Sequence, residues 1–138
     1  MTYALDSNII SYMLRDDDTV YSRYDDAVTG GDKCVIPLIV YYEVRRGLIS
    51  HLSFKKMMVF EKLCADLDIV LLNLYDIDAA AEIYADLRRA GSPIDDADLL
   101  IAAQAAANGY TLVTHNTRHF DGVAGLATED WTIRSSHT

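Results

Sequence analysis

The sequence predicts one α/β domain, residues 1–138, with helices covering both faces of a mostly parallel sheet of four to five strands. Two observations carry this prediction. Short apolar runs alternate along the chain with longer segments of helical periodicity. The length of 138 residues and the hydrophobic content of 51% suit a single domain with a real core. We find no internal repeat, low-complexity tract or linker that would divide the chain.

The first half of the chain is expected to form two strands and four helices. The opening run is short and apolar and ends on Asp6, which is typical of a buried strand. The next segments carry apolar residues at helical spacing, and Pro37 suits the first turn of a helix. The expected elements are strand Thr2–Leu5, helix Asn8–Leu14, helix Val20–Val28, strand Cys34–Ile36, a helix from Pro37 to about Ser50 and helix Phe54–Leu67.

The second half is expected to add three strands and two helices. A continuous apolar run with β-branched residues, Ile69–Leu74, predicts a third buried strand. Gly91 and Gly109 fit the ends of the two helices. The remaining expected elements are a helix capped by Asp76 and running to Ala90, a helix capped at or near Asp95 and running to Asn108, strand Thr111–Thr114, and an edge strand at Trp131–Ile133.

The charge balance argues against one class of nucleic-acid binder. Twelve basic and 21 acidic residues give a net charge of −9, with a pI of about 4.6. A protein that holds phosphates on a uniform basic surface normally has clustered Lys and Arg residues. The same balance is compatible with a metal-dependent enzyme whose acids hold cations.

Several other classes are excluded or disfavoured. The sequence does not predict a membrane-spanning helix, which needs roughly 20 predominantly apolar residues, and the N-terminus lacks the features of a secretory signal. Cys34 and Cys64 lie in apolar surroundings and are expected to be reduced core residues, which indicates the cytoplasm. Zinc-binding spacing, nucleotide-binding glycine loops and a G-x-S-x-G motif are absent from the sequence.

Polar residues fall where the strands end, which is where ligands bind in parallel α/β folds. Several carboxylates in one pocket repel one another unless a cation neutralises them, and oxygen ligands suit Mg²⁺ or Mn²⁺. The residues expected at this edge are Asp6, Glu43, Asp95, Asp96, Asp98, His115 and Asn116.

Each of these residues also has a simpler structural interpretation. Asp6, Asp95 and Asp96 could cap helices. Glu43 is expected to be partly buried and Asp98 well buried, so either could form a structural ion pair with Arg46. A general-base role is open to His115, although a solvent-facing loop histidine is the commoner case. His51, His119 and His137 show no metal-ligand spacing.

Three segments resemble a known family. "ALDSNIISYML" resembles the opening of PIN-domain ribonucleases, and "IPLIVYYEVRRG" resembles their second segment. "SPIDDADLLIAAQAAANGYTLVTHNTRHFDGVAGLATEDW" resembles the C-terminal half of VapC-type toxins from toxin–antitoxin pairs. The resemblance implies a three-layer α/β/α PIN-like fold for residues 1–138 and a Mg²⁺- or Mn²⁺-dependent endoribonuclease.

The resemblance also implies roles for individual residues. The metal-binding acids would be Asp6, Glu43 and Asp98, and Asn116 stands where many members carry a fourth acid. The supporting residues would be Ser7, Asn8 and Thr114, with Asp95 and Asp121 as further candidates. The family further implies a homodimer, a VapB-type antitoxin that covers the site, and a structured RNA such as tRNA as substrate.

Two alternatives stay open at this point. One is a non-catalytic PIN-like interaction module, which the Asn at position 116 keeps in play. The other is an aspartate-based phosphotransfer domain, disfavoured because position 8 is Asn and no Lys follows Lys62. Seven basic residues of the first half could line an RNA groove or simply be solvated: Arg15, Arg23, Lys33, Arg45, Arg46, Lys55 and Lys56.

Overall fold

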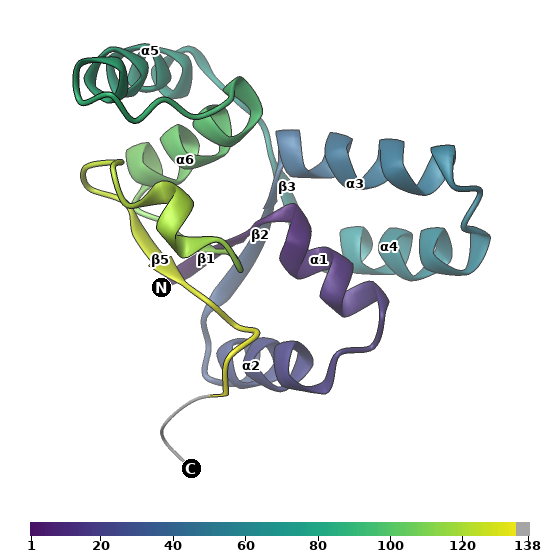
Figure 1. The fold of residues 1–138 in the computed structure, drawn as a ribbon. Coiled ribbons are helices and arrows are strands. Elements are labelled where there is room, and N and C mark those ends of the chain that lie inside the picture. The colour runs from purple at the N-terminus through teal and green to yellow at the C-terminus, as the bar shows by residue number, and fades with distance from the viewer. Residues whose placement is uncertain (135–138) are drawn as a thin grey trace.

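The computed structural model describes residues 1–134, and its strands form one sheet in the order β3-β2-β1-β4-β5 (Figure 1). All four neighbouring pairs are parallel, which confirms the expected parallel sheet. The strands are β1 (Thr2–Leu5), β2 (Lys33–Pro37), β3 (Asp68–Val70), β4 (Thr111–Val113) and β5 (Ala127–Glu129).

Six α-helices and one 3₁₀ helix connect the strands. In Figure 1, α5 and α6 lie together on one side of the strands, and α1, α3 and α4 lie on the other, so the fold has three α/β/α layers. None of the helices within residues 1–134 combines the length and apolar character needed to span a membrane. The helices are α1 (Ser7–Leu14), α2 (Asp18–Thr29), α3 (Leu38–Ser50), α4 (Phe54–Asp66), α5 (Leu74–Arg89), α6 (Asp96–Asn108) and η1 (Thr117–Phe120).

The core surrounds the central strand β1. Ala4 and Leu5 are fully buried there, and Ile9 and Ile10 of α1 are buried against the same core. The ring of Tyr3 meets the edge of the buried Trp131 ring, with 5.1 Å between ring centroids. Burial of these apolar side chains fixes the position of the strand end that carries Asp6.

The predicted edge strand lies at the wrong place in the sequence. The edge strand β5 is Ala127–Glu129 rather than Trp131–Ile133, because Thr111 of β4 pairs with Ala127. Trp131 is buried in a turn after the strand, where its indole nitrogen donates a hydrogen bond to Glu129 at 3.1 Å. Its apolar character reflects packing, not strand pairing.

The predicted third strand is too long and too buried. β3 covers only Asp68–Val70, at the other edge of the sheet, and Leu71 beyond it is 69% exposed. The pairing of β3 stops at Val70 because the partner strand β2 ends at Pro37, and the side-chain amide of Gln104 donates to the carbonyls of Val70 and Leu71, at 3.2 and 3.1 Å.

The helices α1 and α2 begin one and two residues earlier than predicted, and the caps of α3 and α5 also differ. α5 is capped by Asn73, and Asp76 is the reciprocal partner in a capping box rather than the cap. Pro37 is the last residue of β2 and the cap residue of α3. The predicted end of α6 is confirmed, since Gly109 adopts the left-handed conformation with φ +70°.

The register between β1 and β4 places the first candidate site residue. Leu5 lies opposite Val113, so the residues that follow, Asp6 and Thr114, leave the sheet side by side. The backbone N–H of Asp6 donates to the Val113 carbonyl at 2.9 Å. The carboxyl end of β1 is thereby attached to the carboxyl end of β4, and η1 follows β4 in the chain.

Candidate active site

Asp6 is both a helix cap and a buried acid. Its side chain accepts a hydrogen bond from the Ser7 backbone N–H at 2.8 Å, and the residue is only 4% exposed. The Thr114 hydroxyl donates to the other carboxylate oxygen at 2.9 Å. Burial raises the pKa of Asp6, while these hydrogen bonds act in the opposite direction. The capping role proposed from sequence therefore coexists with a buried charge.

Asn8 connects Asp6 to the end of β4. Its amide nitrogen lies 3.5 Å from the Asp6 carboxylate and 3.3 Å from the Thr114 hydroxyl oxygen. Its amide oxygen accepts from the His115 backbone N–H at 3.0 Å. The structure thus brings Ser7, Asn8 and Thr114 into contact with Asp6, as expected of residues that hold this carboxylate in one orientation.

Glu43 reaches the site from α3 with one oxygen left without a partner. Its Oε1 atom is buried and forms no hydrogen bond within residues 1–134. Burial, and after it the charge of Asp6, raises the pKa of Glu43. A buried carboxylate oxygen without a donor is costly, so this atom is available to a ligand.

The structural ion pair with Arg46, left open by the sequence, does not form within residues 1–134. Arg46 forms no ion pair within residues 1–134, and its guanidinium stacks over the Tyr42 ring at 5.0 Å. Its charge acts on Glu43 only through space, where it opposes the rise in pKa. Neither Glu43 nor Asp98 is neutralised by this residue.

Asp98 lies in the first turn of α6 and is less buried than predicted, with a side chain that is 27% exposed. Its carboxylate oxygen lies 2.8 Å from His119 Nε2. Burial, followed by the neighbouring Asp95, raises the pKa of Asp98 from 3.8 to about 6, and the charge of Asp6 adds to the rise. Its sequence neighbours suggested that Asp98 lies on the buried apolar face of the helix. At the start of α6, the side chain is instead partly exposed.

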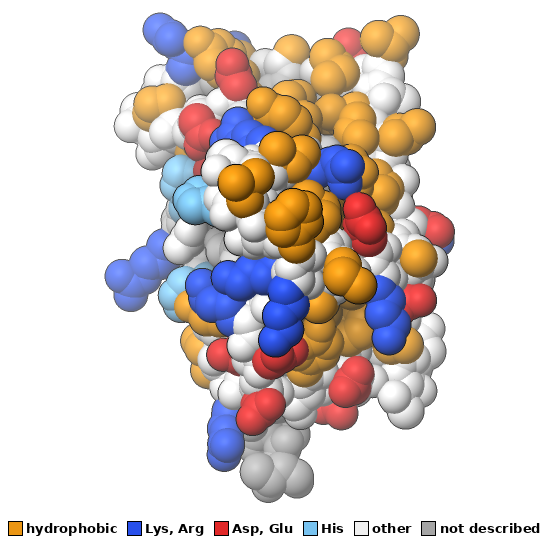
Figure 2. Space-filling model, turned by 90° about the vertical axis from the view of Figure 1, so that its right-hand side faces the viewer, with side chains coloured by type: hydrophobic (Ala, Val, Ile, Leu, Met, Phe, Trp, Pro, Cys, Tyr) orange, Lys and Arg blue, Asp and Glu red, His pale blue; other side chains and the backbone are white. Residues whose placement is uncertain are grey.

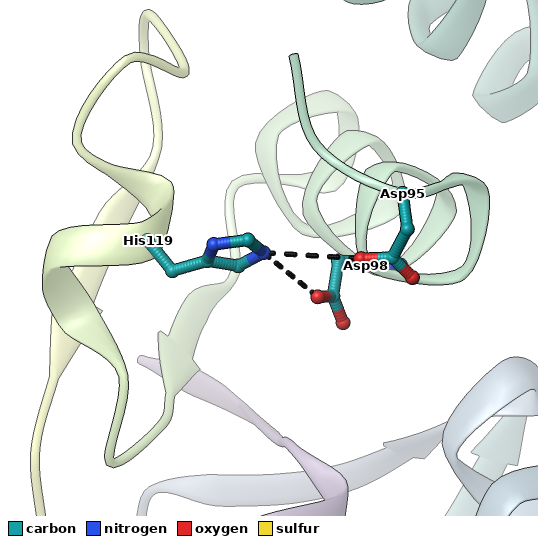
Figure 3. A group of neighbouring side chains, drawn as sticks. All are labelled: Asp95, Asp98 and His119. Atoms are coloured by element: carbon teal, nitrogen blue, oxygen red, sulfur yellow. Dashed lines mark hydrogen bonds and ion pairs between the residues drawn. The ribbon is translucent and has the colours of Figure 1, made fainter. Parts of the chain in front are cut away.

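His119 is the functional candidate that sequence reasoning missed. Figure 3 shows its ring from η1 pointing at Asp95 and Asp98 at the start of α6. The three side chains offer ligand atoms that all lie within 4.8 Å of one another. Because Asp98 and His119 are 21 positions apart, no spacing rule reveals this contact. One feature of the sequence could have indicated His119: it follows the carboxyl end of a predicted strand, which is the edge where the site was expected.

Asp95 has the capping role that sequence analysis favoured. It is the N-cap of α6 and accepts from the Asp98 backbone N–H at 3.5 Å. Its side chain is 62% exposed, and hydrogen bonding with Asp98 lowers its pKa. Asp96 is exposed in the same turn and joins no contact described with the other acids.

The residues after β4 line a hollow of about 580 Å³ beside Asp98 and His119. Asn116 is exposed in this hollow, and its backbone N–H donates to the Thr114 hydroxyl at 3.1 Å. His115 Nδ1 is engaged by Asp130 and Thr132, at 3.2 and 3.0 Å. Asp121 is exposed at the end of η1, and no contact within residues 1–134 joins it to the other acids.

These donors fit a divalent cation. Burial, and to a smaller extent the charge of Asp6, raises the pKa of both Glu43 and Asp98, and a bound cation would offset this penalty on their ionised forms. The unpartnered Glu43 oxygen is the atom that most needs such an ion. Carboxylate oxygens suit Mg²⁺ and Mn²⁺, and the imidazole of His119 suits Mn²⁺ better than Mg²⁺.

Comparison with known proteins gives a consistent result. The family model described as "PIN domain" matches residues 3–126. The chain is 30% identical to the tRNA(fMet)-specific endonuclease VapC of Shigella flexneri over 137 residues, covering 95% of this chain and 98% of that protein. It is 33% identical to ribonuclease VapC2 of Rickettsia felis over 138 residues, with the same coverage.

Solved structures give the same result for the fold. VapBC2 from Rickettsia felis, bound to a promoter DNA fragment, contains a chain that matches with a TM-score of 0.87 and 28% identity, covering 95% of this chain and 99% of that one. VapBC-1 from nontypeable Haemophilus influenzae contains one that matches with a TM-score of 0.85 and 26% identity, covering 96% and 100%. The matches run along almost the whole of both chains.

Proposed function

Since the chain belongs to the PIN-domain family and, within it, to the VapC ribonuclease toxins, we propose that it is a metal-dependent endoribonuclease that acts in the cytoplasm as the toxin of a VapBC-type pair. It would inhibit translation by cutting structured RNA. Transfer RNA is the first substrate class to test, because the Shigella flexneri relative is named for tRNA(fMet). One observation carries the proposal: a carboxylate oxygen of Glu43 is buried without a hydrogen-bond partner within residues 1–134, and burial, followed by the charge of Asp6, raises the pKa of the same carboxyl.

In this proposal Asp6, Glu43 and Asp98 hold a divalent ion, Mg²⁺ or Mn²⁺, and Asn116 supports them from the end of β4. Such an ion, when bound, lowers the pKa of a coordinated water and stabilises charge developing on a phosphodiester. The protein's own task is to keep the three carboxylates ionised and aimed at one place.

Hydrogen bonds perform that task for Asp6 and Asp98. Ser7, Asn8 and Thr114 orient Asp6 and favour its ionised form. His119 Nε2, when it carries the proton, donates to Asp98 and lowers the pKa of that carboxyl. We therefore assign His119 as a positioning residue for Asp98. Asp95 has the opposite effect, because it raises the pKa of the Asp98 carboxyl.

The proposal includes two protein partners. A cognate VapB-type antitoxin would cover the site and silence it, since the chain matches proteins solved as VapBC complexes. A second copy of the chain would form a homodimer. Co-expression with the adjacent small reading frame, followed by size-exclusion chromatography, tests both partners, and relief of growth arrest tests the silencing.

The activity is tested by incubating the purified chain with end-labelled tRNA in Mg²⁺ or Mn²⁺. Cleavage should stop in EDTA, and Asp98→Asn should lower the rate by about 100-fold or more. The matched control is Asp96→Asn, an exposed neighbour in the same helical turn, which should cleave within about twofold of the parent chain. Equal rates for the Asp98→Asn variant and the parent would refute the site assignment.

The same experiment decides between the enzyme and the non-catalytic interaction module. The module predicts no cleavage in either metal and no heat of Mn²⁺ binding by calorimetry. A phosphotransfer domain predicts a phospho-aspartate on Asp6 that can be trapped. Neither alternative accounts for the unpartnered oxygen of Glu43 as directly as a cation ligand does.

A further inference from the structure

We propose that a groove beside the acidic site binds the phosphodiester backbone of RNA through three cations, Arg15, Arg46 and Lys56; this inference rests on the proposed ribonuclease function. We call it the basic groove. It has a volume of about 440 Å³ and lies between α1, α3 and α4. In a chain with a net charge of −9, three cations in one hollow are an unexpected concentration.

The structure separates these cations from the other basic residues of the first half. Three of the seven candidates lie near acids elsewhere: Arg23 at 3.3 Å from Glu129, Lys33 at 2.8 Å from Asp68, and Arg45 at 3.9 Å from Glu61. Lys55 is exposed and lies outside the groove lining.

Arg15, Arg46 and Lys56 have no such partner. All three are exposed and form no ion pair in the part of the chain that the structure describes. Aromatic rings, not acids, support the two arginines: Arg15 lies 4.7 Å above the Tyr12 ring, and Arg46 lies 5.0 Å above the Tyr42 ring. Stacking restrains a guanidinium without neutralising it, so the charge remains available to an anion.

The basic groove leads directly to the candidate active site. Glu43 and Ser7 belong to its lining, so the three cations share one hollow with a site acid and with the residue next to Asp6. Figure 2 shows Lys and Arg side chains gathered near the middle of the face that carries α3 and α4. A strand whose scissile phosphate lies at the acids would therefore place neighbouring phosphates among these cations.

A second hollow also combines a site acid with a cation. It is lined by Asp98 and His119 and contains the exposed Arg118. In Figure 1, η1 and the α3–α4 pair lie on either side of α1. Acids at the centre with cations on both sides match an RNA strand that crosses the site, because only the cleaved phosphate needs the metal.

The expected salt dependence follows from the number of cations. Each phosphate contact with single-stranded nucleic acid contributes a slope of about −0.7 to log K against log [salt]. Three contacts predict a slope of about −2, and loss of one contact at 0.1 M salt weakens binding by about fivefold. Because none of the three cations is paired with an acid within residues 1–134, we expect each to contribute the full slope of about −0.7.

The test is fluorescence anisotropy of a labelled 12-nucleotide single-stranded RNA with the full chain in EDTA, from 50 to 300 mM KCl. Arg15→Gln, Arg46→Gln and Lys56→Gln should each weaken binding by about fivefold at 0.1 M KCl and reduce the slope by about 0.7. The matched control is Arg45→Gln, which removes the neighbouring charge on α3 but lies outside the groove lining. Thermal unfolding of each variant verifies that the fold is retained.

Two results would overturn the inference. One is an unchanged slope in the triple variant. The other is an equal loss of affinity in Arg45→Gln, which would indicate a general effect of net charge. The proposed ribonuclease function fails differently: RNA would bind with the predicted slope in EDTA and yet stay intact when Mn²⁺ is added.

Discussion

Replacing Asp98 with Asn should stabilise the metal-free protein at neutral pH. The carboxyl of Asp98 has its pKa raised from 3.8 to about 6, first by burial and then by Asp95. An acid whose pKa is raised by folding is harder to ionise in the folded state, so stability falls as the pH rises from 3.8 to 6. The asparagine side chain has the same shape as the aspartate and carries no charge to penalise.

The size of the effect follows from the shift. A difference of about two pKa units corresponds to about 3 kcal/mol of unfolding free energy, which is a ceiling. The side chain is 27% exposed, so solvent screening reduces the gain to about 1.5 kcal/mol. For a domain of this length, that gain raises the melting temperature by about 5 °C.

The assay is thermal unfolding in EDTA at pH 7.5 and at pH 4. The gain should be present at pH 7.5 and much smaller at pH 4, where folded Asp98 is almost fully protonated and the unfolded carboxyl, with a pKa of 3.8, is only partly ionised. Asp96→Asn, in the same turn but with an exposed side chain, is the matched control and should change little. If Asp98→Asn is neutral or destabilising at pH 7.5, the carboxyl is not penalised by its surroundings and this reasoning is wrong.

Three further predictions follow from individual contacts. In the metal-free protein, His119→Gln should raise the pKa of Asp98 and Asp95→Asn should lower it, measured by carboxyl ¹³C NMR titration. Burial raises the pKa of Cys34 to about 12, so at pH 8 only about one molecule in 10⁴ carries the thiolate, and a thiol reagent should label this residue only after unfolding. Gly109→Ala should destabilise the chain by about 1 kcal/mol in urea unfolding, because φ is +70° although open space surrounds the position.

Each of these predictions has a clear contrary result. Shifts of the same sign in the two Asp98 neighbours would show that they do not act on its carboxyl in opposite directions. Rapid labelling of Cys34 in the folded chain would place its thiol at the surface. A fully stable Gly109→Ala variant would mean that the end of α6 relaxes into another backbone conformation, and Gly109→Asn, which tolerates the left-handed region better, is the comparison.

The sequence predicts most of the fold because its elements follow local rules. The parallel sheet, the six helices and the stop at Gly109 all come from apolar periodicity and glycine placement. The errors concern residues whose surroundings are set by distant segments. Trp131 packs against Tyr3 from a turn and not from a strand, and β3 ends at Val70 because its partner β2 ends at Pro37.

The candidate site divides in the same way. Asp6 and Asn116 could be placed from sequence because each follows a strand whose end is predictable. The contact between His119 and Asp98 could not, since it depends on the path of η1 after β4. Apolar periodicity also could not predict how far Asp98 is buried. A residue in the first turn of a helix need not face the core, even where the turns that follow do.

The net charge of −9 leads to different expectations about RNA binding from the composition and from the structure. Composition alone counts charges, and by that count RNA is repelled. Binding depends instead on which cations remain unpaired and where they lie. Acids elsewhere engage Arg23 and Lys33, whereas Arg15, Arg46 and Lys56 stay unpaired, within residues 1–134, in the groove that contains Glu43. The acidic remainder of the surface then limits RNA binding to this groove, so the excess negative charge favours selective, salt-sensitive binding at the site over broad affinity.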